Sequence, residues 1–179
     1  MNVRVVAGLM VIVGLLGYAS RTKDITLIDP LLEGVGMKAT RNMRNRNPGN
    51  MRHGPKWLGL AADQSDSEFS TFVDFVHGYR GLVINLRNQF RLYGLMTVRG
   101  IISKFAPSNE NDTESYVDKV SKAMRVSPDA PLDMESRYVL ESMAKAITRH
   151  EGSILLSGDS WANHERYLAQ GLTMAGALS

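Results

Sequence analysis

The 179-residue chain contains no cysteine, which excludes disulfide bonds, thiolate catalysis, cysteine-ligated metals and bacterial lipidation at a cysteine. Acidic residues are missing from one long stretch, since none occurs between Glu33 and Asp63. The basic residues in that window are Lys38, Arg41, Arg44, Arg46, Arg52 and Lys56. Such a stretch suits an anionic partner, namely cell-wall polymer, phospholipid head groups or nucleic acid, although a solvated linker has the same composition.

The chain also lacks any internal repeat, low-complexity segment or metal-ligand spacing. Its histidines, His53, His77, His150 and His164, are too scattered to suggest a metal site, so neither a metal nor a cofactor is predicted. The apolar fraction of 44% supports a real core, and the length suits one domain.

The N-terminus carries an apolar segment without charge, from Val5 to Ala19, preceded by Arg4 and followed by Arg21 and Lys23. A spanning helix needs roughly 20 apolar residues, or about 17 when its end residues snorkel. The segment therefore predicts a transmembrane anchor over residues 1–20 that contacts lipid through residues 3–19. A cleaved secretory signal is the alternative, because Gly17-Tyr18-Ala19 offers small residues at the positions that a signal peptidase reads. Both interpretations place the rest of the chain outside the cytoplasm or in a membrane-bearing particle.

The stretch from Arg46 to Gly59 is rich in Gly, Pro and Asn and is predicted to form turns within a small β-hairpin. It would hold the indole of Trp57 and several side-chain amides at a surface, which suits a polar, ring-shaped ligand such as a sugar. The alternative is an ordinary hairpin whose tryptophan fills the core.

The chain after this stretch has helical periodicity. One long apolar stripe runs from Tyr79 to Tyr93 and stops at Gly94, and Thr97 can cap a second helix. Stripes of a third and a fourth helix follow, at Tyr116, Val117, Val120 and Met124 and then at Leu140, Met143, Ala144 and Ile147. Asp112 or Thr113 is predicted to cap the third helix and Asp133 the fourth, and the residues from Trp161 onward predict a short amphipathic helix.

Glu151 continues the stripe of the fourth helix by one more step, just before Gly152. A carboxylate on the buried face at a helix C-terminus is disfavoured in its ionised form by desolvation and by the helix dipole, so its pKa should be raised. A carboxylic acid that is still protonated near neutral pH can protonate a glycosidic oxygen. Alternatively, Glu151 points into solvent from a frayed last turn, paired with Arg149.

Glu110 is the second acid of interest. It lies between Asn109 and Asn111 in a polar loop, and the capping of the following helix leaves these three side chains unexplained.

Two motifs carry a resemblance to a known family. Asn47-Pro48-Gly49-Asn50 and Glu110-Asn111-x-Thr113-x-x-Tyr116, with Trp57 and Gly78-Tyr79-Arg80 between them, resemble phage virion proteins that degrade peptidoglycan. These are lysozyme-like proteins of the lytic transglycosylase type. The resemblance covers roughly residues 41–152, and Phe105 stands where the family often has tryptophan.

The resemblance implies a mainly α, lysozyme-like domain with a small β-hairpin. Such domains place a catalytic glutamate at the end of a helix directly before the sheet region, where this chain offers only Glu33. We therefore expect a circular permutation, with Glu151 facing the Asn-Pro-Gly-Asn turn across a cleft. The expected organisation is a 1–20 anchor, a 21–45 basic tether, a 46–155 catalytic domain and a 156–179 C-terminal extension.

The implied activity is cleavage of the N-acetylmuramic acid–N-acetylglucosamine bond of peptidoglycan, by a lytic transglycosylase or a lysozyme-type glycosidase. Glu151 is the expected general acid and Glu110 the second candidate. The expected glycan-binding residues are Asn47, Asn50, Arg52, Trp57 and Tyr116. The protein would lie in a virion membrane or on the periplasmic side of the host envelope, with other virion proteins as further candidate partners.

Two alternatives belong to other functional classes. A non-catalytic, membrane-anchored virion structural or wall-binding protein would keep the cleft but lack a working acid. A basic membrane protein would contact packaged nucleic acid through residues 38–56, with affinity that falls steeply with salt. The nucleic-acid alternative is disfavoured because it assigns no function to the Asn-Pro-Gly-Asn motif or to the Glu-Asn-x-Thr motif.

Overall fold

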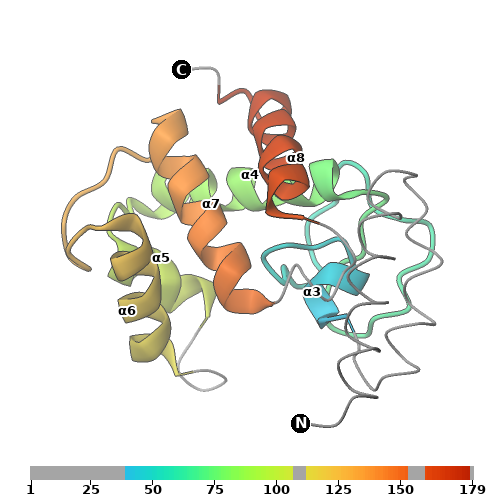
Figure 1. Ribbon diagram of the computed structural model, residues 1–179, viewed down its shortest axis with the longest axis horizontal. Coiled ribbons are helices and arrows are strands. Elements are labelled where there is room, and N and C mark those ends of the chain that lie inside the picture. Colours follow the sequence, from blue (N-terminus) through green and yellow to red (C-terminus); the bar gives the residue numbers. More distant parts are fainter. Residues whose placement is uncertain (1–38, 107–111, 153–159, 178–179) are drawn as a thin grey trace, which may run out of the picture.

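The computed structural model describes residues 39–106, 112–152 and 160–177, and in these ranges the chain is mainly helical, as predicted (Figure 1). The helices are α3 (Arg41–Arg44), α4 (Phe75–Tyr93), α5 (Val98–Phe105), α6 (Thr113–Met124), α7 (Arg137–Glu151) and α8 (Trp161–Met174). Helix α4 packs against both α7 and α8, and α6 packs between α5 and α7. No helix in these ranges is long and apolar enough to cross a membrane. The predicted anchor at residues 1–20 lies outside them.

The small β-hairpin expected after Arg46 is reduced to two isolated antiparallel bridges within the described residues, Arg52 with Phe69 and Leu60 with Phe72. Pro55 lies between the bridged positions Arg52 and Leu60 and has no backbone N–H to donate, which disfavours a regular ladder between them. The two segments are instead joined by scattered backbone hydrogen bonds and by the side chains of the Asn-rich turn.

Helix α4 begins four residues before the predicted stripe. The carboxylate of Asp74 accepts a hydrogen bond from the backbone N–H of His77 and caps the helix. Gly94 ends it in the left-handed conformation, at φ 67°, as predicted. The stripe is buried from Tyr79 to Leu86, whereas Tyr93 at its end is 59% exposed.

Two of the predicted caps are present and one is wrong. Thr97 accepts from the backbone N–H of Gly100 at the start of α5, and Asp112 does the same for Ser115 at the start of α6. Helix α7 starts after Ser136 instead of Asp133. The side chain of Asp133 accepts from the backbone N–H of Glu135 and closes the turn before the helix.

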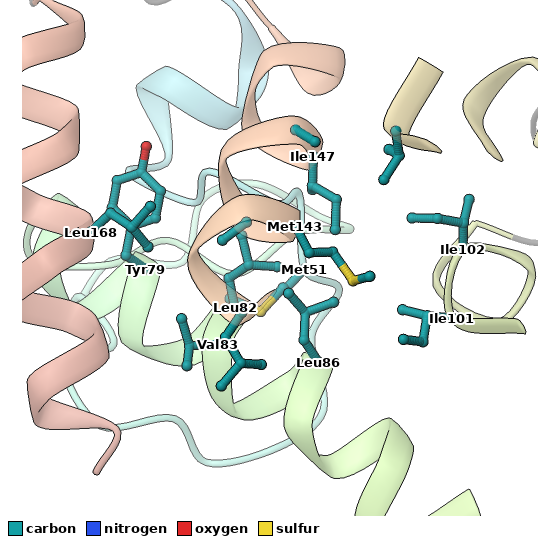
Figure 2. Close-up of a cluster of buried hydrophobic side chains, with 14 of the residues drawn as sticks. Met51, Tyr79, Leu82, Val83, Leu86, Ile101, Ile102, Met143, Ile147 and Leu168 are labelled. Atoms are coloured by element: carbon teal, nitrogen blue, oxygen red, sulfur yellow. The ribbon is translucent and has the colours of Figure 1, made fainter. Parts of the chain in front are cut away.

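The core joins side chains from elements far apart in the sequence (Figure 2). Met143 and Ile147 of α7 lie among Leu82 and Leu86 of α4 and Ile102 of α5, and all of them are fully buried. Burying one such side chain contributes about 1.5–3 kcal/mol, so this cluster fixes the angle at which α7 crosses α4.

Helix α8 belongs to this core. Leu168 and Leu172 are buried, and Gly171 permits a close crossing because a Cβ atom there would stand 2.8 Å from the backbone nitrogen of Arg80. The predicted 156–179 extension is therefore, over its described part, an integral layer of the domain.

The predicted tether over residues 21–45 also reaches into the domain. Asn42 and Met43 of α3 are buried. Gly78 of α4 has no room for a side chain because the carbonyl oxygen of Arg46 lies against it. The folded unit therefore starts before residue 46, although the charged and amide-rich sequence there predicts a linker.

Candidate active site

The C-terminal end of α7 places Glu151 beside the Asn-Pro-Gly-Asn turn. The buried stripe through Leu140, Ala144 and Ile147 leads to Glu151 at the last helical residue, as the spacing predicts. Figure 1 shows the C-terminal end of α7 near α3. The next residue, Gly152, lies against the start of α3, since a Cβ atom there would collide with the side-chain oxygens of Thr40 and Asn42. The end of α7 is therefore held in place rather than frayed.

Asn50 connects the turn to this carboxylate. Its side-chain N–H donates to Oε2 of Glu151 over 2.7 Å. The backbone of Asn50 is left-handed, at φ 44°, a conformation that asparagine tolerates better than most residues. Gly49 precedes it where a Cβ atom would stand 2.7 Å from Leu82 and 3.3 Å from Phe105, so only glycine lets the turn approach the core so closely.

Tyr116 of α6 holds the other carboxylate oxygen. Its hydroxyl donates to Oε1 of Glu151 over 2.7 Å, and its ring stacks on His150 with 3.6 Å between ring centroids. Tyr116 is buried, and burial together with the adjacent Glu151 carboxylate raises the pKa of its hydroxyl above the ordinary value. Tyr116 thus positions the acid and does not face a ligand directly, in contrast to its predicted glycan-binding role.

The pKa of Glu151 is raised above the ordinary value, as predicted. Burial is the main cause, and the hydrogen bonds from Tyr116 and Asn50 act in the opposite direction because they favour the ionised form. The site therefore combines a carboxyl group that retains its proton more readily than usual with two donors that fix its orientation.

A groove of about 680 Å³ opens beside Glu151. Its lining residues are Arg41, Gly49, Asn50, Met51, Arg52, His53, Pro55, Trp57, Glu68, Phe69, Asn85, Asn88, Gln89, Leu92, Tyr93, Lys104, Phe105, Ala106 and Glu151. This volume lies in the range of small-molecule sites. The predicted residues Asn50, Arg52 and Trp57 share the groove with Glu151, and half-buried Trp57 also packs on the core.

Asn47 does not face the groove. It is fully buried, and its side-chain N–H groups donate to the carbonyl oxygens of Met51 and Ser70 over 2.8 and 2.9 Å. Its side-chain oxygen accepts from the backbone N–H of Met51 over 2.9 Å. The predicted ligand-binding role of Asn47 is therefore replaced by a structural one, because all of these polar groups are used to hold the turn.

One wall of the groove was not anticipated from the sequence. Asn85, Asn88 and Gln89 present side-chain amides from one face of α4. Their spacing of three and four residues indicates in the sequence that they share a helix face. The same helix carries a more pronounced apolar stripe, which already explains why the segment is helical. Amides can donate and accept hydrogen bonds, so this wall is suited to hydroxyl and acetamido groups.

A second carboxylate, Glu68, also lines the groove, and it is bound to Arg41 over 2.7 Å. Arg41 forms a further pair with Asp66 over 2.7 Å. Asp66 also accepts from the side chain of Asn45, and these interactions hold its pKa well below the usual range. Glu110 and Glu33 lie outside the described residues.

The arginines of the basic stretch are used within the fold. Besides the ion pairs of Arg41, the guanidinium of Arg44 donates to the carbonyl oxygen of Ala39, and that of Arg46 donates to the carbonyl oxygen of Phe72 over 3.4 Å. These contacts within the fold are an additional role for the three arginines, and the expected contact of the basic stretch with an anionic partner stays a prediction.

No group of three histidine, aspartate or glutamate side chains that could hold a metal ion is found where the structure describes the chain. Searches against models of protein families found no match. The chain is 35% identical to protein P5 of Pseudoalteromonas phage PM2 over 103 residues. This similarity covers 55% of the present chain and 64% of the phage protein, so the chain is similar to a bacteriophage protein over less than two thirds of that protein's length.

Proposed function

We propose that the chain is a phage muralytic enzyme that cleaves the N-acetylmuramic acid–N-acetylglucosamine bond of peptidoglycan, with Glu151 as general acid. The observation that carries this proposal is the environment of Glu151. It lines a groove, both of its oxygens accept hydrogen bonds, and burial raises its pKa. A buried acid of this kind is what glycoside cleavage requires near neutral pH.

The groove supports a glycan as the ligand. Amide side chains on α4 offer hydrogen bonds to hydroxyl and acetamido groups, and the indole of Trp57 offers an apolar surface for a sugar ring. The lining stretch of α4 from Asn85 to Tyr93 is about 12 Å long at the usual helical rise, which gives room for more than one sugar.

The proposed fold is lysozyme-like with a permuted order of elements. In this interpretation α7 supplies the catalytic helix, and the turn segment from Asn47 to Phe72 supplies the opposite wall of the cleft. The bond between Asn50 and Glu151 supports it, because the turn meets the helix end although it precedes α7 in the chain.

In the proposed reaction the carboxyl group of Glu151 gives its proton to the glycosidic oxygen while the bond to the sugar carbon breaks. The resulting cationic sugar is then captured either by water, which loses a proton to a base, or by a hydroxyl group of the same sugar, which closes an anhydro ring and returns its proton to the ionised Glu151. Hydrolysis needs a base to activate water, and Glu68 is a carboxylate in the groove, held by Arg41. The intramolecular route uses no water and therefore needs no second carboxylate. Glu68 would thus be required for hydrolysis and dispensable for formation of the anhydro ring.

The proposed location is a virion membrane or the periplasmic side of the host envelope. The similarity to a phage protein and the apolar segment from Val5 to Ala19 support it. A non-catalytic virion protein that binds the wall would use the same groove without proton transfer.

The test is incubation of the purified protein with peptidoglycan, followed by mass spectrometry of the soluble products. We expect muropeptides that end either in a reducing muramic acid or in its anhydro form, which is lighter by one water. Glu68→Gln should suppress only the reducing-end product if water is activated by this residue. Wall binding without any release of glycan fragments would favour the non-catalytic alternative.

A further inference from the structure

Lys104 brings into the groove a positive charge that no carboxylate of the described residues compensates. It lies in the last turn of α5, and its side chain is exposed and lines the groove. The ammonium group stands 3.9 Å from the centroid of the Tyr93 ring. No carboxylate in the described parts of the chain forms an ion pair with it, so the only partner assigned to it there is an aromatic face.

Most of the other charges around the groove are matched, and Arg52, a further cation in the lining, lies with its guanidinium 5.2 Å from the centroid of the Phe69 ring. Glu68 is paired with Arg41, and Arg41 also binds Asp66. Glu151 accepts two hydrogen bonds and tends toward its neutral form because its pKa is raised. Among the residues that the structure describes, Lys104 therefore leaves an excess of positive charge on the α5 side of the groove.

Lys104 and Glu151 line the same groove. The next residue, Phe105, packs against the turn at Gly49, and the residue after Gly49 is Asn50, which holds Glu151. A substituent on a sugar in the groove can therefore reach Lys104 while the sugar chain lies near the acid.

We infer that Lys104 and Tyr93 form a subsite for a carboxylate carried by the glycan, so that the groove prefers anionic strands over uncharged ones. This inference rests on the proposed function. The carboxylate has two possible sources, which are the carboxylates of an attached peptide and, on muramic acid that carries no peptide, the free lactyl group. Both present the same group to an ammonium ion, and Tyr93 supplies an exposed ring beside it.

The expected effect is modest because an exposed ion pair contributes little in water. A ratio of about three to five between the affinities for charged and uncharged strands is consistent with such a pair. The preference should weaken as salt is raised from 50 to 500 mM, at a Debye length that shrinks from about 14 to about 4 Å.

The test measures binding in the full-length Glu151→Gln protein in detergent, so that its outcome does not depend on cleavage. Three soluble glycans are compared: peptide-bearing strands, strands stripped of peptide with a free lactyl carboxylate, and peptide-bearing strands whose carboxyl groups are converted to amides. Lys104→Gln is the test variant. Lys122→Gln is the matched control, since Lys122 is exposed on α6 outside the groove lining.

The control should bind the peptide-bearing strands about three to five times more tightly than the amidated ones, and Lys104→Gln should bind both equally. Stripped strands that bind as tightly as the peptide-bearing ones, and do so only with Lys104, would show that the subsite also accepts the lactyl carboxylate, and weak binding of stripped strands would assign it to the peptide. Equal preference in Lys104→Gln and the control, or no preference in the control, would overturn the inference. A preference that depends on Lys104 in a protein that cleaves nothing would support the subsite while refuting the proposed enzyme activity.

Discussion

Asn50 and Glu151 are 101 positions apart in the sequence and are joined by a 2.7 Å hydrogen bond. This bond connects the two parts of the chain on which the proposed activity depends, the Asn-Pro-Gly-Asn turn and the end of α7. It also fixes one of the two oxygens that could carry the catalytic proton.

Asn50→Gly should remove the hydrogen bond that orients the Glu151 carboxyl group while leaving the conformation of the turn unchanged. Glycine retains the left-handed backbone but removes the amide that donates to Glu151. Because that donor favours the ionised form, its loss should raise the pKa of Glu151 further. A general acid works only when protonated, so the alkaline limb of the pH–rate profile should move to higher pH while the maximal rate falls about tenfold. An alkaline limb that stays in place or moves to lower pH would contradict this account.

Tyr116→Phe tests whether Tyr116 positions the acid or binds glycan. The ring and its stacking on His150 remain, and only the hydroxyl that donates to Glu151 is lost. We expect kcat to fall about tenfold with KM nearly unchanged, because Tyr116 does not line the groove. Steady-state kinetics on soluble glycan strands would decide this. An unchanged kcat with a raised KM would restore the glycan-binding role predicted from the sequence.

Asp66→Asn should destabilise the fold by about 2–3 kcal/mol at neutral pH, since it removes a carboxylate that accepts charge-assisted hydrogen bonds. The folded-state pKa of Asp66 is depressed, so its contribution to stability is complete above its unfolded pKa of 3.8 and is lost as pH falls toward the folded value. Urea unfolding of the wild type and the variant should therefore converge between pH 5 and pH 2. Asp63→Asn, for which no ion pair is found among the described residues, is the control. A difference that persists unchanged at pH 2 would show that the ionised carboxylate is not the cause.

Deletion of residues 1–20 tests the expected anchor. The folded unit described here begins at residue 39, so the shortened protein should fold, unfold cooperatively and remain in the supernatant after sedimentation with vesicles. The full-length protein is expected to sediment with the vesicles. Continued sedimentation of the truncated protein would show that another surface binds the membrane.

Periodicity and turn chemistry predicted much of the fold because they act locally. The stripe that leads to Glu151, the glycine stop at Gly94 and the cap at Thr97 each depend on residues within one or two helical turns. The turn around Gly49 was also predictable, since glycine and proline restrict the backbone directly.

The errors concern features that depend on distant partners. The buried position of Asn47 depends on the carbonyl oxygen of Ser70, and the role of Tyr116 depends on the end of α7. The charged sequence of helix α3 predicts a linker, whereas in the folded protein Arg41 of this helix forms an ion pair with Asp66. Sequence spacing gives no access to such pairings, because the partners are 20 or more positions apart.

The amide wall on α4 shows a related difficulty. The helix carries an apolar stripe and an amide stripe, and only the apolar one is needed to explain the helix. The spacing of Asn85, Asn88 and Gln89 on one helix face can be seen in the sequence, but nothing in the sequence indicates that this face lines a groove.

The central claim is tested most directly by the cleavage rate of Glu151→Gln on peptidoglycan, measured beside the wild type at pH 6–7. The glutamine can keep both contacts, since its oxygen can accept from Asn50 and its N–H can donate to the hydroxyl oxygen of Tyr116. The fold should therefore survive, with a free energy of unfolding equal to or above that of the wild type at pH 8, because a desolvated acid with a raised pKa is replaced by a neutral amide. Removal of the transferable proton should lower the rate by a factor of about 10² to 10⁴. A folded Glu151→Gln protein that cleaves at the wild-type rate would contradict the account, and loss of activity in Glu110→Gln beside it would transfer the acid role to that residue.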